Sequence, residues 1–355
     1  MKTSRVSLVI LVSTLAALLL SSCAGGTVYN TWPGLSAKDG VVYLAYINAI
    51  FAVQDGNTLW RYPEKPDNAK AFYAPPAFTS DLVIAADYAN HIYGINPANG
   101  SEAWVFAEAK DSGGHFVGGP LVVEDTILAP SSDHNLYALD LNGKKRWTYR
   151  TGNVLWAQPA SDGKMVYLPA MDHHLYALNL SDGSLVWKKD LGSALPSSPV
   201  LAADGSLYIA SLSGDVFALD PATGAVRWNT QVEGEVWSAP LLVEDTLYLG
   251  SSSGKVYRLT ADQGQVQKAT DLGSPVIAGG VRFDETVVFP TESGALFALD
   301  SEGKITSWKP TVNGKLYTTP VVVNDQVVVA IKDGDKLLAA FDQNGAEVWS
   351  FTAPK

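Results

Sequence analysis

From residue 27 onward, apolar residues fall into short runs separated by turn residues, and this arrangement recurs along the chain. The sixth occurrence contains four such runs in a row, over residues 238–245, 246–251, 255–260 and 265–270. Short runs rich in Val, Leu, Tyr and Thr and bounded by Gly, Asp or Ser are typical of β-strands joined by tight turns. The pattern predicts units of four strands, A to D in chain order, with no helix after residue 22.

Two markers give the length of the unit. Seven units carry a turn glycine followed by a strand-D tryptophan, at Gly56…Trp60, Gly100…Trp104, Gly143…Trp147, Gly183…Trp187, Gly224…Trp228, Gly303…Trp308 and Gly345…Trp349; the sixth has Gly264 but Lys268. A Pro or Gly lies 23–25 residues before each glycine, at Pro33, Pro76, Pro120, Pro159, Pro199, Pro240, Gly280 and Pro320. Eight repeats of about 40 residues predict an all-β fold, an eight-bladed β-propeller of four-stranded antiparallel blades over residues 30–355.

The tryptophan column predicts a structural role. Strand D is the outermost strand, where neighbouring blades diverge and a large side chain can fill the wedge between them. The alternative is a set of exposed aromatic clamps for a ligand. The sixth unit departs twice, because Arg258 replaces a small residue after the strand-C aromatic and Lys268 replaces the tryptophan. We therefore expect its junction with the next blade to be the weakest and the most hydrated.

The N-terminus predicts export and a lipid anchor. Lys2 and Arg5 precede an apolar run over residues 6–20, which is too short for a membrane span and suits a signal peptide of residues 1–22. The sequence Leu20–Ser21–Ser22–Cys23 resembles the bacterial lipobox, so Cys23 is the expected lipidated residue and residues 23–29 a short tether. Cys23 is the only cysteine, which leaves no thiol for a disulfide or a cysteine-based metal site. The alternative is a chance cysteine in an ordinary signal peptide.

The acidic net charge of the chain argues against a nucleic-acid partner. The net charge of −11 becomes −13 once Lys2 and Arg5 are removed with the signal peptide, and charged residues make up only 17% of the chain. Binding to a nucleic-acid backbone needs clustered Lys and Arg, so we expect no nucleic acid as a partner. A closed ring of eight blades also predicts a monomer.

Three phrases carry a family resemblance: residues 136–147 (LYALDLNGKKRW), 175–187 (LYALNLSDGSLVW) and 216–228 (VFALDPATGAVRW). They resemble the PQQ-like repeat, with its aromatic-Ala-Leu-Asp run, turn glycine and docking tryptophan. The resemblance covers about residues 30–353. It implies the propeller fold but not one function, because the repeat occurs in quinoprotein enzymes and in cofactor-free scaffolds.

Two branches of that repeat family imply different functions. Quinoprotein dehydrogenases bind pyrroloquinoline quinone and Ca²⁺ under a disulfide of adjacent cysteines, and this chain has neither the second cysteine nor their long inserted loops. The chain is more similar to the BamB lipoproteins of outer-membrane β-barrel assembly, in its lipobox, size, blade number and lack of a catalytic set. It departs from them in its short tether and in lacking their Leu- and Arg-rich docking loop.

That resemblance implies a non-catalytic, membrane-anchored scaffold or binding module of the bacterial envelope, without a cofactor and with a protein partner. Its propeller would face the periplasm or another extracytoplasmic space. A quinoprotein dehydrogenase and a glycan- or substrate-binding lipoprotein are the two alternatives.

The face that carries the D-to-A connections is the candidate partner surface. Its loops over residues 61–75 and 105–119, the second containing His115, are longer than the other connections. Aromatic residues stand three positions before the strand-A marker in the even blades, at Tyr73, Trp156, Trp237 and Tyr317. Because strand A is innermost, we expect them around one mouth of the ring, as a platform for a peptide or glycan. The alternative is steric filling of the hub.

The histidines raise the question of a metal site. All five, His91, His115, His134, His173 and His174, lie in repeats 2–4, beside Asp133 and Asp172. His134 and His173, however, share a B–C turn column that holds Gly or Asn elsewhere, and histidine is among the residues enriched at positive φ. We therefore expect left-handed turn residues at these two positions and no metal site.

Overall fold

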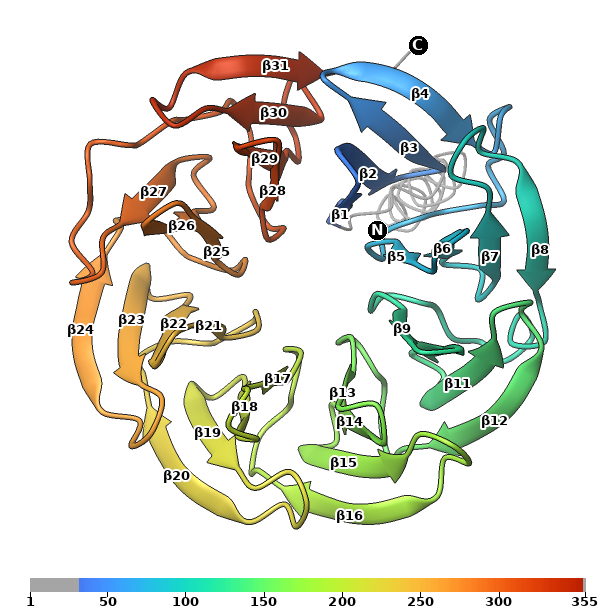
Figure 1. The fold of residues 1–355 in the computed structure, drawn as a ribbon, viewed down its shortest axis with the longest axis horizontal. Coiled ribbons are helices and arrows are strands. Elements are labelled where there is room, and N and C mark those ends of the chain that lie inside the picture. The colour runs from blue at the N-terminus through green and yellow to red at the C-terminus, as the bar shows by residue number, and fades with distance from the viewer. Residues whose placement is uncertain (1–31, 354–355) are drawn as a thin grey trace, which may run out of the picture. The chain divides into compact units, whose positions relative to one another are not determined.

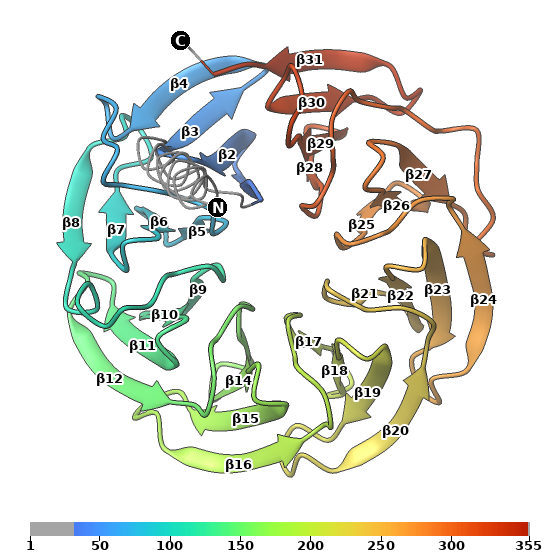
Figure 2. The same ribbon diagram turned by 180° about the vertical axis from the view of Figure 1, so that it is seen from behind.

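The computed structural model describes residues 32–353, and these form a ring of eight antiparallel sheets around a common axis (Figures 1 and 2). The predicted all-β, eight-bladed propeller is confirmed. The predicted signal peptide (1–22), the lipidated Cys23 and the tether (23–29) lie outside the described residues.

Each blade is built from consecutive strands, with strand A innermost and strand D at the rim (Figure 1). Blades 1 to 4 comprise β1 (Gly34–Lys38), β2 (Val41–Tyr46), β3 (Ala49–Gln54) and β4 (Asn57–Tyr62); β5 (Ala77–Phe78), β6 (Val83–Ala86), β7 (Ile92–Ile95) and β8 (Glu102–Phe106); β9 (Leu121–Val123), β10 (Thr126–Pro130), β11 (Asn135–Asp140) and β12 (Lys145–Arg150); β13 (Ala160–Ser161), β14 (Met165–Pro169), β15 (His174–Asn179) and β16 (Leu185–Asp190).

Blades 5 to 8 repeat the arrangement, with one short sheet. They comprise β17 (Val200–Leu201), β18 (Leu207–Ala210), β19 (Asp215–Leu219) and β20 (Val226–Gln231); β21 (Leu241–Val243), β22 (Thr246–Gly250), β23 (Lys255–Thr260) and β24 (Val266–Asp271); β25 (Val281–Phe283), β26 (Thr286–Pro290) and β27 (Leu296–Leu299); β28 (Val321–Val323), β29 (Gln326–Ala330), β30 (Leu338–Phe341) and β31 (Glu347–Phe351).

The hydrophobic core lies between the blades, not within one blade. Its eight clusters each draw residues from two neighbouring blades. Alternate residues of one strand serve opposite neighbours: Val166 and Leu168 of β14 pack toward blade 3, whereas Tyr167 packs toward blade 5. Successive side chains of a strand point to opposite faces of the sheet, so both faces of every blade are apolar. This is why strand B reads as a continuous apolar run.

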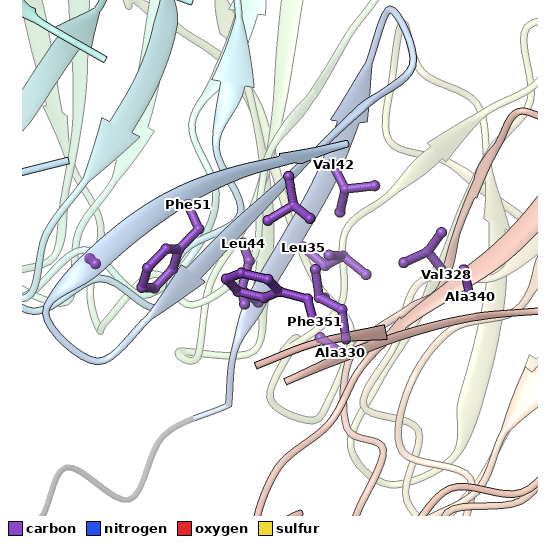
Figure 3. Packing of buried hydrophobic residues seen from close by; sticks show 11 residues of the cluster. Leu35, Val42, Leu44, Phe51, Val328, Ala330, Ala340 and Phe351 are labelled. Carbon is purple, nitrogen blue, oxygen red and sulfur yellow. The ribbon is translucent and has the colours of Figure 1, made fainter. Parts of the chain in front are cut away.

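The ring closes by packing rather than by a shared strand, because blades 1 and 8 have no strand in common. Leu35, Leu44 and Phe51 of blade 1 meet Val328 and Phe351 of blade 8 in one buried cluster (Figure 3). The Phe51 and Phe351 ring centroids are 5.5 Å apart. The interface that joins the two ends of the chain is therefore of the same kind as the seven others.

Each strand-D tryptophan contacts the following blade. The indole of Trp104 lies against Gly143, where an added Cβ would meet indole carbon at 2.4 Å, and its Nε1 donates to Leu141 O at 3.1 Å. Gly143 also has φ +78°, so both the space and the backbone conformation require glycine. Equivalent indole-to-carbonyl hydrogen bonds of 2.7–3.0 Å are donated by Trp60, Trp147, Trp187, Trp228 and Trp308.

The remaining tryptophan, Trp349, spans the closing junction. Its ring contacts Gly56 of blade 1, while its Nε1 donates to Gln326 Oε1 within blade 8 at 2.7 Å. The tryptophans thus occupy the junctions rather than a common ligand surface, and Trp60 and Trp308 are the most buried, with 6% and 8% exposed.

Blade 6 has a different pair at this junction. Across strands β23 and β24, Arg258 stands directly opposite Lys268, where other blades pair a small residue with the tryptophan. Lys268 is exposed, and only the base of its side chain approaches Gly303 of the next blade, with Cγ at 3.2 Å and Cβ at 3.5 Å from an added Cβ position. Arg258 Nε is buried, and within the described residues it has no hydrogen-bond partner. Lys268 removes the indole that packs at the other junctions. In addition, two like charges directly opposite each other on neighbouring strands repel, which destabilises the pairing.

Blade 7 departs from the predicted four regular strands. Its outer segment, residues 304–312, forms no continuous strand. It meets the inner part of the blade through the isolated bridges Leu299↔Ile305 and Ala295↔Thr311 and through a few backbone hydrogen bonds. Here the turn glycine and Trp308 are five residues apart instead of four, and Pro310 has no N–H to donate to the ladder. The extra residue and the proline account for the interruption.

We predict that Trp60→Ala lowers the free energy of unfolding by about 3–5 kcal/mol, because it removes a buried indole and its inter-blade hydrogen bond. Lys268→Ala, at the equivalent position of blade 6, should change the free energy by less than about 0.5 kcal/mol because that side chain is exposed. Chemical denaturation of both full-length variants measures the difference. Similar losses from the two substitutions would contradict the role of the tryptophan.

A second prediction concerns the junction between blades 6 and 7. Amides of β24 and of residues 304–312 should exchange with deuterium faster than those of β4 and β8, because no indole covers the junction and the outer strand of blade 7 is interrupted. Hydrogen exchange followed by mass spectrometry reports on each segment. Equal protection at all eight junctions would refute the prediction.

Candidate functional site

One face of the ring carries the D-to-A connections, the B–C turns and both ends of the described chain. The B–C turn of blade 1, with Ile47 and Asn48, borders an open pocket of about 350 Å³ that also includes Ala353. Trp32, which enters strand A of blade 1 from the same side, contacts residues of two other D-to-A connections. This face is called the D-to-A face below.

Trp32 forms the centre of an aromatic cluster that the sequence pattern did not indicate. Its ring stacks on Tyr317 of blade 8 with centroids 5.1 Å apart and planes at 16°, and meets Trp237 of blade 6 edge-on at 6.3 Å. Blades 7 and 8 lie between blades 6 and 1 along the ring, so Trp32 has to lean over the hub to reach both. Thr318 Oγ1 of blade 8 donates to Pro33 O at 2.6 Å, which fixes the chain immediately after Trp32.

Carboxylates hold the two partners of Trp32 in place. Trp237 Nε1 donates to Glu235 Oε2 at 2.9 Å, and the Tyr317 hydroxyl donates to Glu292 Oε1 at 2.7 Å. Lys315 Nζ donates to the same Glu292 oxygen at 3.0 Å. Hydrogen bonds from Tyr317 and Lys315 lower the pKa of Glu292, so the carboxylate stays ionised and keeps the tyrosine oriented.

The four aromatics predicted for the mouth are not equivalent. Trp156 is 41% exposed, Trp32 is 39% exposed, and Trp237 and Tyr317 are half-buried. Tyr73 is only 6% exposed and packs edge-on against Tyr88 at 5.7 Å, so it contributes little accessible surface. We call Trp32, Trp156, Trp237 and Tyr317 the aromatic mouth.

His115 belongs to the wall of blade 2. Its ring stacks on Tyr88 at 3.7 Å, its Nδ1 lies 2.6 Å from Tyr88 O, and its backbone N–H donates to Ser132 Oγ at 2.8 Å. The histidine therefore ties the long connection of residues 105–119 to the B–C turns of blades 2 and 3. Through Tyr88 it is connected to Tyr73, but no described contact joins it to the aromatic mouth.

The other histidines are turn and strand residues. His134 and His173 have φ of 77° and 73°, which confirms the left-handed turn predicted for them. His174 begins β15, whereas His91 immediately precedes β7, and its backbone N–H donates to Asp87 Oδ1 at 2.8 Å. Within residues 32–353, no three His, Cys, Asp or Glu side chains are grouped closely enough to hold a metal ion.

Carboxylates in the B–C turns explain part of the polarity of blades 2–4. In each blade the strand-C tyrosine donates to a turn aspartate, in the pairs Tyr93–Asp87 (2.8 Å), Tyr137–Asp133 (2.6 Å) and Tyr176–Asp172 (2.5 Å). These pairs anchor the turn to the strand behind it. They are structural contacts, and the histidines beside them share the same turns.

The long connection between blades 2 and 3 is fastened by a buried amide. Asn90 is fully buried, and its Nδ2 donates to Ala109 O at 2.8 Å and to Ser112 Oγ at 2.6 Å. Its Oδ1 accepts from Ser131 Oγ at 3.0 Å. The extra residues of loop 105–119 are therefore held against the blade by hydrogen bonds.

The long connection between blades 1 and 2 is fastened by a cation. Lys70 Nζ lies 4.0 Å from the centroid of the Tyr93 ring, donates to the Tyr62 hydroxyl at 2.9 Å, and is 3.9 Å from Glu102. A pocket of about 340 Å³ with Asp67 at its edge opens beside these residues. Burial is the main cause that raises the pKa of Tyr62, and the hydrogen bond to Glu102 raises it further, so the hydroxyl stays protonated.

The innermost connection residues offer no charged side chain to the cofactor that gives the repeat its name. Pyrroloquinoline quinone is a tricarboxylate that is bound with Ca²⁺, and such a pair needs cationic and carboxylate side chains that converge on one point. The residues directly before the strand-A Pro or Gly marker carry no charge; they are Trp32, Pro75, Gly119, Gln158, Ser198, Ala239, Gly279 and Thr319. The aromatic mouth can instead offer stiff, amphipathic surface to a peptide or a sugar.

A family model described as outer membrane protein assembly factor BamB matches residues 29–156, 112–234, 171–274 and 252–355. Together these matches run from residue 29 to residue 355 without a gap. The chain belongs to the BamB family. The predicted resemblance is confirmed at the level of family and PQQ-like repeat.

Individual BamB relatives are distant. BamB of Salmonella typhimurium is 31% identical over 93 residues, and BamB of Escherichia coli is 30% identical over 93 residues. Each match covers 24% of this chain and 24% of the relative, so it spans about a quarter of the length of these curated proteins.

Solved structures extend the likeness in fold to nearly the whole ring. BamB from Moraxella catarrhalis aligns with a TM-score of 0.74 at 17% identity, covering 86% of this chain and 95% of that one. The computationally designed Ika8 protein aligns equally well, with a TM-score of 0.74 at 13% identity, covering 88% of this chain and 96% of Ika8. A natural and a designed propeller match alike, so the fold by itself does not select a partner. Residues 32–353 contain no helix that is long and apolar enough to cross a membrane.

We predict that Asp133→Asn destabilises this BamB-family propeller at neutral pH but has little effect in acid. Burial raises the pKa of Asp133, but hydrogen bonds from Tyr137, Ser112, the Asn135 amide and Ser131 outweigh it and leave the pKa lowered. A lowered pKa in the folded state means that the ionised carboxylate stabilises the protein above the ordinary pKa of about 4. That contribution is lost as the pH falls through the lowered value.

Denaturation of wild type and Asp133→Asn at a series of pH values from 7 downward measures the effect. The gap between the two proteins should narrow below about pH 4. Asp335→Asn, at an exposed position of blade 8, is the matched control and should show no gap. A gap that is constant with pH would contradict the stabilising role of the ionised Asp133.

Proposed function

We propose that this chain is an exported, lipid-anchored, non-catalytic scaffold of the bacterial envelope that binds a protein partner during assembly of outer-membrane proteins. The observation that carries the proposal is the match to the BamB family model along residues 29–355. The lipobox-like sequence ending at Cys23 supports the anchor.

The aromatic mouth is the proposed contact surface for the partner. Trp32, Trp237 and Tyr317 form one stacked group, and two carboxylates fix the orientation of its outer members. Rigid aromatic side chains lose little conformational freedom on binding, which is why Trp and Tyr contribute strongly to protein interfaces. Trp156 extends this surface toward blade 4.

The experiment compares capture of envelope proteins by full-length wild type and by a Trp156→Ala, Trp237→Ala double variant, both expressed in native membranes. If the two residues contribute about 1.4 kcal/mol together, the affinity for the partner should fall about tenfold. A Val186→Ala, Val226→Ala variant is the matched control, because both valines are exposed on outer strands away from the mouth.

Recovery of an outer-membrane β-barrel assembly protein with wild type and the control, but not with the double variant, supports the proposal. Undiminished capture by a stably folded double variant would exclude the mouth as the contact surface. Capture of no assembly protein, or dye-linked oxidation of an alcohol after addition of pyrroloquinoline quinone and Ca²⁺, would contradict the proposed function.

A further inference from the structure

The position of Trp32 shows where the anchored N-terminus leaves the ring. Its contacts with Trp237 and Tyr317 place it over the hub of the D-to-A face, away from the rim. The hydrogen bond from Thr318 to Pro33 O fixes this exit point to blade 8. The tether is therefore joined to the ring at the aromatic mouth.

The distance from this exit to the proposed lipid is short. Cys23 precedes Trp32 by nine residues, and nine fully extended residues span at most about 30 Å. A random-coil chain of nine residues has an r.m.s. end-to-end distance of about 17 Å. The membrane must lie within this distance of the aromatic mouth.

The dimensions of a blade restrict the orientation further. Four strands about 4.8 Å apart extend about 14 Å outward from the inner strand, and a strand of five or six residues is about 18 Å long. To bring the opposite face to the membrane, a tether running around the rim would have to cross both distances and the hub, which exceeds its reach. A tether running through the hub would have to span about 18 Å inside the ring alone, which is more than its r.m.s. length. If the rim of the ring faced the membrane, the tether would have to run from the hub across a whole blade. That distance would stretch the tether beyond its r.m.s. length.

We propose that the short tether holds the D-to-A face toward the membrane, so that the aromatic mouth binds a partner segment lying within about 30 Å of the lipid headgroups. This inference rests on the lipid anchor of the proposed function. The partner it fits is a membrane-inserted protein that presents an extended segment close to the bilayer surface. A partner whose binding segment lies deeper in the envelope cannot reach the mouth.

The test measures which face of the ring is near the lipid. Ser213 and Ala222 are exposed at opposite ends of β19, Ser213 in the B–C turn on the D-to-A face and Ala222 in the C–D turn on the other face. With Cys23 lipidated, Ser213→Cys or Ala222→Cys supplies the single reactive thiol of the full chain. A donor dye at each position is combined with vesicles that carry an acceptor dye on their headgroups.

Energy transfer from position 213 should be several times that from position 222. Equal transfer, or stronger transfer from position 222, in protein that sediments with the vesicles would overturn the inference while leaving the anchor intact. Protein that stays in the supernatant would overturn the anchor of the proposed function, and the inference with it.

A second variant tests the role of tether length. Inserting about 20 Gly and Ser residues after Gly26 should lower the effective concentration of the mouth at the membrane about sixfold. In the lengthened protein, energy transfer from positions 213 and 222 should become nearly equal. Chemical cross-linking of the partner in native membranes should also fall in proportion to the effective concentration. An unchanged difference would mean that something other than the tether orients the ring, and would overturn this part of the inference.

Discussion

The whole ring depends on one kind of contact, the packing of a blade against its neighbour. No blade buries its own apolar faces, since each of the eight core clusters is shared by two blades. At the rim the contact is directional: an indole lies on a glycine of the next blade and donates to a carbonyl there. Blades 1 and 8 meet through the same packing, so the ends of the chain need no shared strand to close the ring.

This dependence explains why the fold could be read from the sequence. The interaction is repeated, so the positions of the tryptophan, the glycine and the apolar strand recur at a fixed spacing. Even the exceptions had visible signals: Arg258 and Lys268 prove to be cross-strand partners, and Pro310 and the longer glycine-to-tryptophan spacing mark the interrupted strand of blade 7. The turn column likewise showed that His134 and His173 needed positive φ, which the backbone has.

The candidate site was less predictable, because it lies where the repeats differ. Tyr73 and Trp237 occupy equivalent columns, but Tyr73 is buried behind Tyr88 while Trp237 faces the hub. The burial of each aromatic residue depends on the side chains of the neighbouring blades, and the alignment of the repeats does not show which side chains those are. Trp32 lies two residues outside the aromatic column, and only the three-dimensional closure of the ring brings it to Trp237 and Tyr317.

The place where the chain begins its ring is also where its symmetry is most strongly broken. The other seven blades start strand A from a connection that is fixed at both ends, and their residues at the Trp32 position are small or uncharged. Blade 1 has no preceding blade to supply that connection, so the position is free to hold a large aromatic residue that covers neighbours across the hub. The same free end is the one that Cys23 would tether. With the proposed anchor at Cys23, the surface suited to a partner and the point where the tether joins the ring would therefore coincide, because both lie where blade 1 begins over the hub.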